Sequence, residues 1–275
     1  MVSTLMDAPD VLKKIAAYKV GEVEALKAET TIKALRRKAA SLPKPRGFEA
    51  ALLKSAQTRP ALICEIKKAS PSKGIIRKDF NPAAIAKAYE TGGAACMSVL
   101  TDGPGFQGSP AIFKQVRETT SLPLLRKDFM LDPIQITESA AMGADCVLII
   151  MGLLTDNTAK ALFDEAGALG LDVLIETHTR GELERALKLG GTLIGINNRD
   201  LRTFDTSLET FAKLAPLVPR NATLIAESGI FTRDHIETLT TQGAQGFLIG
   251  ESLMRQEDVA SATRTLLANP PSGGM

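Results

Sequence analysis

The sequence predicts an α/β protein, a closed (β/α)8 TIM barrel with an N-terminal helical extension. From residue 61 onward, eight short apolar runs alternate with amphipathic stretches. The runs are apolar throughout, which is typical of strands buried on both faces of a parallel sheet. Their ends stand about 20 to 35 residues apart, which suits one strand and one helix each. The chain of 275 residues also has the length of a single barrel of this kind.

The composition is that of a globular chain, and it excludes several classes of protein. Hydrophobic residues make up 44% and charged residues 23%, which excludes disorder of the whole chain. The net charge of +2 and the aromatic content of 4% argue against nucleic acid as a partner. No run approaches the ~18 apolar residues of a transmembrane helix. Charged residues occupy the N-terminus, where a signal peptide would need an apolar stretch. We therefore predict a cytoplasmic protein with no nucleic-acid or membrane partner.

The three cysteines do not form a redox or metal motif. Cys64, Cys96 and Cys146 stand far apart, and each lies in an apolar run. An odd number cannot pair completely. We expect buried, reduced thiols, which implies a reducing compartment.

The first 60 residues differ from the rest of the chain. Their helix patterns cover residues 8–29, 31–40 and 48–55. A Pro-rich connector lies at residues 43–47, and the basic side chains of Arg36, Arg37 and Lys38 are expected to face solvent. We predict that residues 1–60 pack on the barrel without a core of their own. Residues 61–275 then form the catalytic barrel, and the whole chain is one domain.

The eight apolar runs predict the strands in order along the chain. They lie at residues 62–67, 96–101, 123–127, 145–150, 172–176, 193–197, 223–227 and 246–250. Eight βα units in series favour a closed barrel over an open, doubly wound sheet. The open sheet remains an alternative on this pattern alone. The dinucleotide motif G-x-G-x-x-G is absent from the first loop, which disfavours it.

Helix start signals separate the strands. The pairs Asn81-Pro82, Ser109-Pro110 and Asp132-Pro133 each combine an N-cap residue with proline at the first helical position. The next four caps are expected at Thr155, Thr179, Ser207 and Thr232. Glycines are expected where helices stop, at Gly92, Gly143, Gly170, Gly190 and Gly243. The last helix is expected at residues 256–267.

Ionisable and amide side chains gather at the ends of the predicted strands. They are Glu65, Lys67, Lys127, Glu176, Asn197, Arg199 and Glu227. Chemistry in barrels of this type occurs at the C-terminal ends of the strands. Any one of these residues could belong to a solvated loop or a structural ion pair. Their convergence at one end of the barrel predicts acids and amines that shift each other's pKa values for acid–base catalysis.

The last two strands are followed by glycines. Ser228 and Gly229 follow the seventh strand, and Gly250 follows the eighth. Glycine lets backbone N–H groups approach an anion, and these two loops form the usual phosphate site in such barrels. A simple turn would explain either glycine alone, but the pair predicts a phosphate site.

Six linked motifs carry a resemblance to a known family. They are CEIKKASPSKG (64–74), SVLTD with FQGS (98–102, 106–109), LLRKDF (124–129), GINNRDL (195–201), ESGI (227–230) and FLIGESLM (247–254). In order and spacing they resemble indole-3-glycerol-phosphate synthase over nearly all of residues 60–255. The N-terminal extension is similar as well. We expect a monofunctional chain without a fused second enzyme of tryptophan biosynthesis.

The resemblance implies a carboxy-lyase of tryptophan biosynthesis. Its substrate would be 1-(2-carboxyphenylamino)-1-deoxyribulose 5-phosphate, which is cyclised, decarboxylated and dehydrated to indole-3-glycerol phosphate. It implies no organic cofactor and no metal. The expected partner is this small phosphorylated substrate. We expect a monomer, with at most weak contacts to other enzymes of the pathway.

The resemblance also implies roles for the residues at the strand ends. Lys127 would be the general acid at the C2′ carbonyl, with a pKa lowered by neighbouring cations. Glu176 would be the general base. Lys67 would hold the anthranilate carboxylate and the phosphate end, while Glu65 would orient the lysine and the sugar hydroxyls. Asn197 completes the catalytic set. The division of the proton transfers among Lys67, Glu65 and Lys127 stays open at this point.

Further residues are implied to bind the substrate. Arg199, together with Asn197, would hold hydroxyl, carboxylate or phosphate groups, and Glu227 would bond a sugar hydroxyl or Asn197. Phe106 and Phe129 would sandwich the anthranilate ring, although Phe129 could simply pack in the core. The phosphate would contact Ser70, Ser228, Gly229, Gly250 and the backbone N–H of Glu251.

The two histidines and two alternative functions are less consistent with the sequence. His178 and His235 lack evident partners for a triad or a metal site and are expected to be structural or exposed. A sugar-phosphate isomerase or epimerase would keep the phosphate loops without the set of Lys67, Lys127 and Glu176. A catalytically silent scaffold would have lost one of these three residues, yet all are present.

Overall fold

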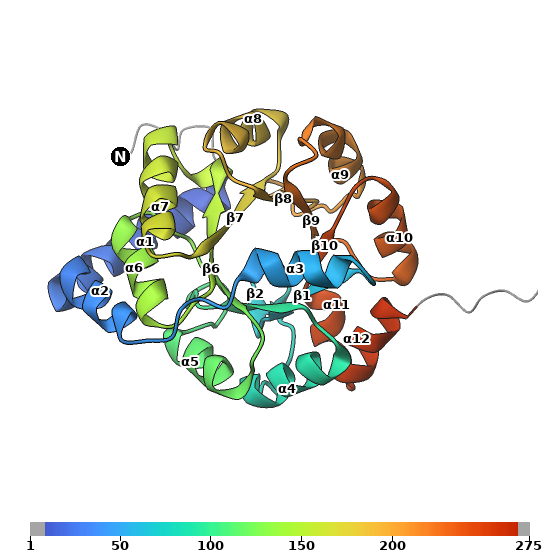
Figure 1. Cartoon of the computed structure of the whole chain (residues 1–275), viewed down its shortest axis with the longest axis horizontal. Coiled ribbons are helices and arrows are strands. Elements are labelled where there is room, and N and C mark those ends of the chain that lie inside the picture. The colour runs from blue at the N-terminus through green and yellow to red at the C-terminus, as the bar shows by residue number, and fades with distance from the viewer. Residues whose placement is uncertain (1–8, 269–275) are drawn as a thin grey trace, which may run out of the picture.

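A closed barrel of eight parallel strands forms the centre of the molecule (Figure 1). The computed structural model describes residues 9–268. In chain order the strands are β1 (Ala61–Ile66), β4 (Cys96–Leu100), β5 (Leu124–Lys127), β6 (Cys146–Ile150), β7 (Asp172–Thr177), β8 (Leu193–Asn197), β9 (Thr223–Glu227) and β10 (Gly246–Ile249). β10 pairs with β1 and closes the ring, which confirms the barrel and excludes the open sheet.

The apolar runs become strands because both of their faces are covered. Most strand residues are fully buried, one side inside the barrel and the other beneath the helices. Each predicted strand agrees with the observed one to within one residue at either end. Cys64, Cys96 and Cys146 lie in β1, β4 and β6, where they are buried and free, as expected.

Helices surround the barrel. They are α4 (Pro82–Gly92), α5 (Pro110–Thr119), α6 (Pro133–Ala141), α7 (Asp156–Ala168), α8 (Arg180–Lys188), α9 (Glu209–Leu214), α10 (Arg233–Thr241), α11 (Glu251–Met254) and α12 (Val259–Leu267). Short 3-10 turns lie at Met151–Leu153 and Ala215–Leu217, and a small hairpin, β2 (Ala69–Ser70) with β3 (Gly74–Ile75), follows β1. No helix within residues 9–268 is long and apolar enough to cross a membrane.

The cap predictions are confirmed with two differences. The side chains of Asn81, Ser109, Asp132, Thr155, Thr179 and Thr232 each accept a bond from a backbone amide of their helix. Ser207 lies one residue before the N-cap of α9, which is Leu208, but its Oγ still accepts the backbone N–H of Glu209 at 3.3 Å. The last helix begins at Val259 rather than at residue 256. Asp258 caps it, and the short α11 takes up the preceding segment.

The segment before β1 runs along the barrel from one end to the other. α1 (Asp10–Glu29) contributes Leu12 and Ile15 to the cavity at the C-terminal ends of the strands. α2 (Ile32–Ala40) packs on the flank against α6. α3 (Phe48–Ala56) lies across the opposite end, in front of the barrel in Figure 1, where it contacts β1 and β4.

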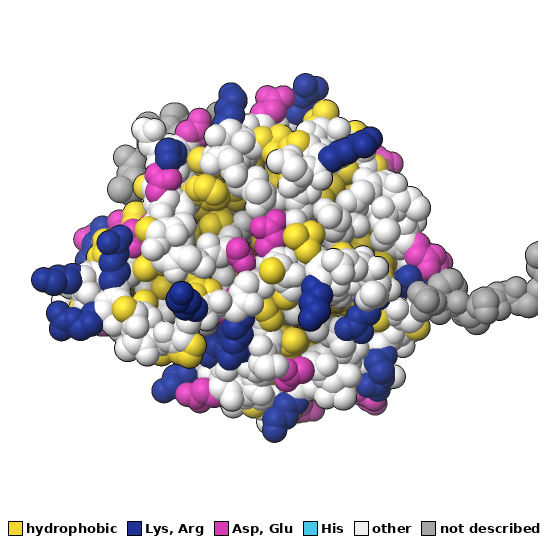
Figure 2. Space-filling model, viewed as in Figure 1, with side chains coloured by type: hydrophobic (Ala, Val, Ile, Leu, Met, Phe, Trp, Pro, Cys, Tyr) yellow, Lys and Arg dark blue, Asp and Glu magenta, His cyan; other side chains and the backbone are white. Residues whose placement is uncertain are grey.

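The surface carries both signs of charge. Figure 2 shows Lys and Arg side chains around the edge of the α3 face, interspersed with Asp and Glu, and several of them over α2. Arg36, Arg37 and Lys38 of α2 are exposed, as expected, and Arg36 pairs with Glu165 of α7.

Candidate active site

One cavity at the C-terminal ends of the strands brings together all the site residues predicted from the sequence. The lining includes Glu65, Lys67, Ser70, Phe106, Lys127, Phe129, Glu176, Asn197, Arg199, Glu227, Ser228, Gly229, Gly250 and Glu251. They reach it because parallel strands in a barrel all end at the same rim. The prediction that these residues converge is therefore confirmed.

Lys127 joins three strands at the centre of the cavity. Its Nζ lies 3.0 Å from Glu176 Oε2 and 2.8 Å from Glu227 Oε2. Burial opposes the charge, but the carboxylates of Glu176, Glu227 and Glu65 raise the pKa of Lys127 above its usual range. The expectation of a lowered pKa is wrong, because the neighbours of this lysine are acids rather than cations.

The two glutamates that contact Lys127 are not equivalent. Both are almost completely buried, at 3% exposure for Glu176 and 1% for Glu227. Burial alone would raise the pKa of Glu176, yet Lys127 and His178 hold it below its usual range. Burial raises the pKa of Glu227, and the negative charge of Glu176 adds to this despite the attraction of Lys127. Glu176 is therefore the more acidic of the two carboxyl groups.

Asn197 and Arg199 connect the end of β8 with neighbouring loops. Asn197 Nδ2 donates to Glu176 Oε1 at 3.1 Å, and its Oδ1 accepts the backbone N–H of Arg199 at 3.0 Å. Glu227 was expected to bond either a sugar hydroxyl or Asn197. The structure shows Asn197 bonded to Glu176 instead. The Arg199 guanidinium donates to Ser72 Oγ at 3.0 Å and lies 3.4 Å from the carboxylate of Glu251.

Glu65 and Lys67 face the cavity from the end of β1. Lys67 Nζ lies 2.5 Å from Glu65 Oε1, and the Glu65 side chain is 5% exposed. Alternation along a strand places both on one side, as predicted. The pair supplies a second lysine and carboxylate next to the group around Lys127.

Backbone amides and glycines shape the side of the cavity formed by β9 and β10. Ser228 and Gly229 both have a positive φ, and a Cβ on Gly229 would lie 2.6 Å from Thr206 Cγ2. Gly250 directly precedes α11, whose first-turn N–H groups have no partner within the helix. The carboxylate of Glu251 is held between Arg199 and Arg255. An anion here would therefore meet N–H groups rather than that carboxylate.

Two phenylalanines line the cavity from adjacent loops. Phe106 follows β4 and Phe129 follows β5, and their ring centroids are 6.1 Å apart at an angle of 40°. Phe129 also packs against the main hydrophobic core. It therefore lies both in the lining of the cavity and against the core, the two positions expected for it.

His178 lies outside the lining of the cavity, but it contacts Glu176, which the sequence did not predict. Its Nε2 lies 3.4 Å from Glu176 Oε1, and its Nδ1 lies 3.3 Å from Glu182 Oε2. The side chain is partly buried and bonded to Glu182, which agrees with the structural role expected for it. Burial opposes its charge, but the bond to Glu182 and the charge of Glu176 raise its pKa. Its position two residues after Glu176 could have signalled the contact, because alternate residues point the same way.

The apolar face of α1 was missed as well. Val11, Leu12 and Ile15 line the cavity beside Phe129. An apolar helix face looks the same in sequence whether it covers a core or a ligand cavity. Among the described residues, no group of three or more His, Cys, Asp or Glu side chains could hold a metal ion.

Comparisons with known proteins agree with this arrangement. A family model described as indole-3-glycerol phosphate synthase matches residues 12–266. An indole-3-glycerol phosphate synthase of Azospirillum brasilense is 50% identical over 260 residues, which cover 94% of this chain and 99% of that protein. These likenesses favour the lyase over the isomerase and the silent scaffold.

Solved structures of lower identity share the fold. An N-acetylmannosamine-6-phosphate 2-epimerase from Clostridium perfringens matches with a TM-score of 0.57 and 17% identity, over 73% of this chain and 90% of that chain. A thiamine phosphate pyrophosphorylase from Pyrococcus furiosus matches with a TM-score of 0.55 and 18% identity, over 75% and 93%. At such identities the likeness concerns the barrel alone.

Proposed function

The chain belongs to the indole-3-glycerol phosphate synthase family, and from this premise we propose how its cavity carries out the reaction. It is a carboxy-lyase of tryptophan biosynthesis and binds 1-(2-carboxyphenylamino)-1-deoxyribulose 5-phosphate. In the reaction, the ring carbon that bears the carboxylate attacks C2′, and the carbonyl oxygen takes a proton. The bond between that ring carbon and the carboxylate then breaks. Carbon dioxide departs, and the electron pair of the bond stays in the ring. Loss of the C2′ hydroxyl as water, with removal of one proton, completes the indole.

Lys127 is the general acid of this proposal. The contacts with Glu176 and Glu227 keep it protonated in a largely buried cavity, which is the form that an acid requires. It delivers a proton to the C2′ oxygen during ring closure and assists the same oxygen when it leaves as water. Lys67, paired with Glu65, binds the carboxylate of the substrate until carbon dioxide departs.

Glu176 is the general base. Its lowered pKa keeps it ionised at neutral pH, so it can accept the proton released on dehydration. Asn197 and His178 contact its Oε1, while Lys127 contacts its Oε2, so both oxygens are oriented. Glu227 is placed to bind a sugar hydroxyl, because its Oε1 is buried without a hydrogen-bond partner among residues 9–268.

The two ends of the substrate have separate sites in this proposal. The phosphate binds Ser70, the Ser228-Gly229 turn and the N–H groups after Gly250, with Arg199 nearby. The anthranilate ring lies between Phe106, Phe129 and the apolar face of α1. The known phosphate site at the last two loops of such barrels supports this orientation.

The observation that carries the proposal is the contact of Lys127 Nζ with two buried carboxylates, inside the cavity that holds the phosphate loops. The test is to supply the carboxyphenylamino substrate without added metal and to follow indole fluorescence. We expect turnover. Folded protein that produces no indole signal would refute the proposal.

We also propose a monomer in which residues 1–60 are an extension of one barrel domain and which works in the cytoplasm. One chain supplies every residue assigned above, and its three free, buried thiols suit a reducing compartment. The proposal includes no organic cofactor and only weak contacts with other enzymes of the pathway. Sedimentation at micromolar concentration tests the monomer, and a stable dimer would contradict it.

Gly229→Val tests the phosphate site. The positive φ and the contact with Thr206 mean that a side chain here distorts the turn. We expect KM to rise by about tenfold or more with a smaller change in kcat, because phosphate binding acts in the ground state as well as in the transition state. Steady-state kinetics measures both constants.

Gly170→Val is the matched control for this variant. Gly170 lies two residues after the end of α7 at a similar φ of +70°, with nothing within 4 Å of an added Cβ and no place in the cavity. We expect it to carry the same backbone strain and an unaltered KM. An unaltered KM in Gly229→Val would instead place the phosphate elsewhere.

A further inference from the structure

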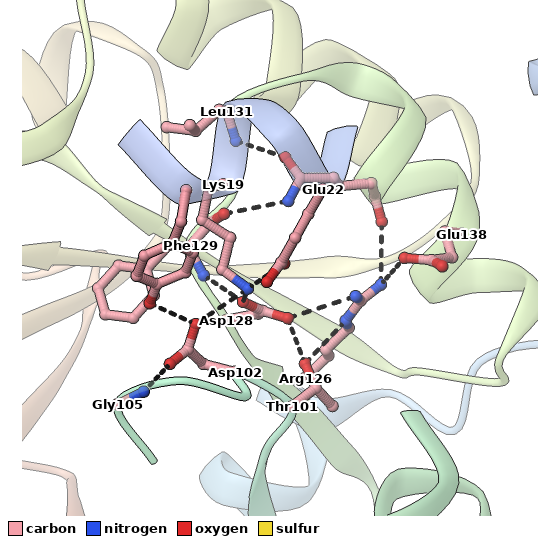
Figure 3. Close-up of polar contacts among 12 residues, drawn as sticks. Lys19, Glu22, Thr101, Asp102, Gly105, Arg126, Asp128, Phe129, Leu131 and Glu138 are labelled. Carbon is pink, nitrogen blue, oxygen red and sulfur yellow. Dashed lines mark hydrogen bonds and ion pairs between the residues drawn. The ribbon is translucent and has the colours of Figure 1, made fainter. Parts of the chain in front are cut away.

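A buried ion cluster ties α1 to two loops of the barrel (Figure 3). Lys19 Nζ lies 3.0 Å from Asp102 Oδ1, 2.7 Å from Asp128 Oδ1 and 2.7 Å from Glu22 Oε2. The relative exposure is 1% for Lys19, 0% for Asp102 and 4% for Asp128. We call Lys19, Asp102, Asp128 and Arg126 the Lys19 cluster. Lys19 does not itself line the cavity.

Each acid of the Lys19 cluster belongs to a loop that carries a cavity phenylalanine. Asp102 Oδ2 accepts the backbone N–H of Gly105 at 3.2 Å, directly before Phe106. Asp128 lies between Lys127 and Phe129, and its Oδ1 accepts the N–H of Phe129 at 2.8 Å (Figure 3). One ammonium group therefore connects the two loops whose rings face each other.

The same lysine also orients α1 over the cavity. Leu12 and Ile15 precede Lys19 by seven and four residues, so all three side chains share one face of the helix. Leu12 and Ile15 line the cavity, while Lys19 reaches the acids beneath. The ion cluster thus fixes the apolar wall and both rings relative to one another.

Among the described residues, only one other side chain of α1, that of Tyr18, is bonded to either acid, and it reaches Asp102 alone. Asp128 Oδ2 is bonded to Thr101 and Arg126, which are both residues of the barrel. Tyr18 donates to Asp102 Oδ1 at 2.7 Å but does not contact Asp128 by any such bond. Removing Lys19 would leave two buried carboxylates with Arg126 as the remaining cation of the cluster.

We propose that Lys19 is a positioning residue that sets the slot for the aromatic ring of the substrate through Asp102 and Asp128. The inference rests on the proposed function, which assigns the ring to Phe106, Phe129 and α1. The inference concerns the aromatic end of the substrate alone. Within residues 9–268, no hydrogen bond or ion pair joins the Lys19 cluster to the phosphate loops after β9 and β10.

Two competitive inhibitors test the proposal. Anthranilate probes the ring site, and inorganic phosphate probes the site at Gly229 and Gly250. In Lys19→Met we expect anthranilate to bind about tenfold or more weakly, which is about 1.4 kcal/mol per factor of ten. The inhibition constant of phosphate should change less than about twofold. Equal weakening of both would indicate general loosening of the barrel and would overturn the proposal.

Lys27→Met is the matched control. Lys27 lies on the same helix and pairs with Asp132 of the barrel at 2.8 Å, but its side chain is 42% exposed. Both inhibitors should bind this variant as they bind the unaltered protein. Loss of anthranilate binding here would mean that any link between α1 and the barrel suffices, which contradicts a specific role for Lys19.

A double variant separates positioning from charge balance. Lys19→Met with Asp102→Asn removes one buried negative charge along with the positive one, and the amide oxygen of the new side chain can still accept the N–H of Gly105. We expect its thermal midpoint to recover towards that of the unaltered protein while anthranilate binding stays weak. Recovery of both would reduce Lys19 to charge compensation and refute the proposal.

The proposed function and this inference fail in different ways. Absence of indole-3-glycerol phosphate formation by the unaltered protein would refute the function. Anthranilate and phosphate binding, measured directly by calorimetry, would still report on Lys19. Normal anthranilate binding by folded Lys19→Met would refute the inference while leaving the function intact.

Discussion

Lys127→Ala is expected to lower kcat by at least about 10²-fold and up to about 10⁴-fold, the range typical of a lost general acid. Lys127 holds the only proton-donating ammonium that contacts both Glu176 and Glu227 in the described part of the chain. Without it, the C2′ oxygen loses its proposed proton donor. Single-turnover kinetics with the carboxyphenylamino substrate measures the loss.

The same substitution should change how stability depends on pH. It leaves Glu176 and Glu227 buried together without their cation, so the pKa of each carboxyl in the folded state should rise. A carboxyl whose pKa is raised on folding binds more protons when folded. Its contribution to stability is therefore lost as pH rises through that pKa. We expect Lys127→Ala to unfold more easily at alkaline pH than at mildly acidic pH.

Lys160→Ala serves as the control for Lys127→Ala. Lys160 lies on the exposed face of α7, where it pairs with Asp164 at 2.7 Å. Such a surface pair contributes ~0–1 kcal/mol, so neither kcat nor the pH dependence of unfolding should move. Circular dichroism at neutral pH checks that both variants are folded. Turnover by folded Lys127→Ala within tenfold of the unaltered protein would remove Lys127 from the role of general acid.

Glu176→Gln is expected to have the second large effect on turnover. The amide has nearly the same shape as the carboxylate but cannot accept the proton released on dehydration. We expect kcat to fall by about 10²-fold to 10⁴-fold while KM changes little. Glu227→Gln is the matched control, since Glu227 contacts the same lysine at 2.8 Å. A hydroxyl-binding role predicts a smaller change in kcat and a larger change in KM for that variant.

The pH profile gives an independent check on Glu176. Activity needs its carboxylate, and Lys127 and His178 hold its pKa below the usual range. The acidic limb of kcat/KM should therefore lie at low pH. His178→Gln removes one of the positive charges that lower this pKa, so the limb should move towards higher pH. A limb that stays in place would show that His178 does not act on the general base.

The positions of the candidate residues could be predicted because they depend on strand topology. Lys127, Glu176 and Glu227 are far apart in the chain, yet each ends a buried apolar run. Parallel strands in a closed barrel all end at one rim, so these side chains had to meet. The position of the glycines after β9 and β10 could be predicted for the same reason, because they directly follow two of these strands.

The charges that surround each residue could not be predicted. Lys127 was expected beside cations, but its bonded neighbours are Glu176 and Glu227. Which side chains touch depends on rotamers and on the tilt of each strand, and a one-dimensional pattern holds neither. The error reversed the expected direction of the pKa shift of Lys127.

Lys19 illustrates the same limit most clearly. In the sequence it is one of several lysines of an amphipathic helix, where a lysine is ordinarily a solvated residue. Folding buries it completely, because Asp102 and Asp128 of two distant loops supply the opposite charges.

The sequence by itself determined the eight strands, their order along the chain and the set of residues at their ends, because apolar periodicity and strand ends are local features of the chain. It favoured the closed barrel, which the pairing of β10 with β1 then established. Only the tertiary structure decided which of those residues contact one another, which helix covers them and which buried lysine joins that helix to the barrel. These features arise from contacts across the sequence, and their energies depend on burial and distance.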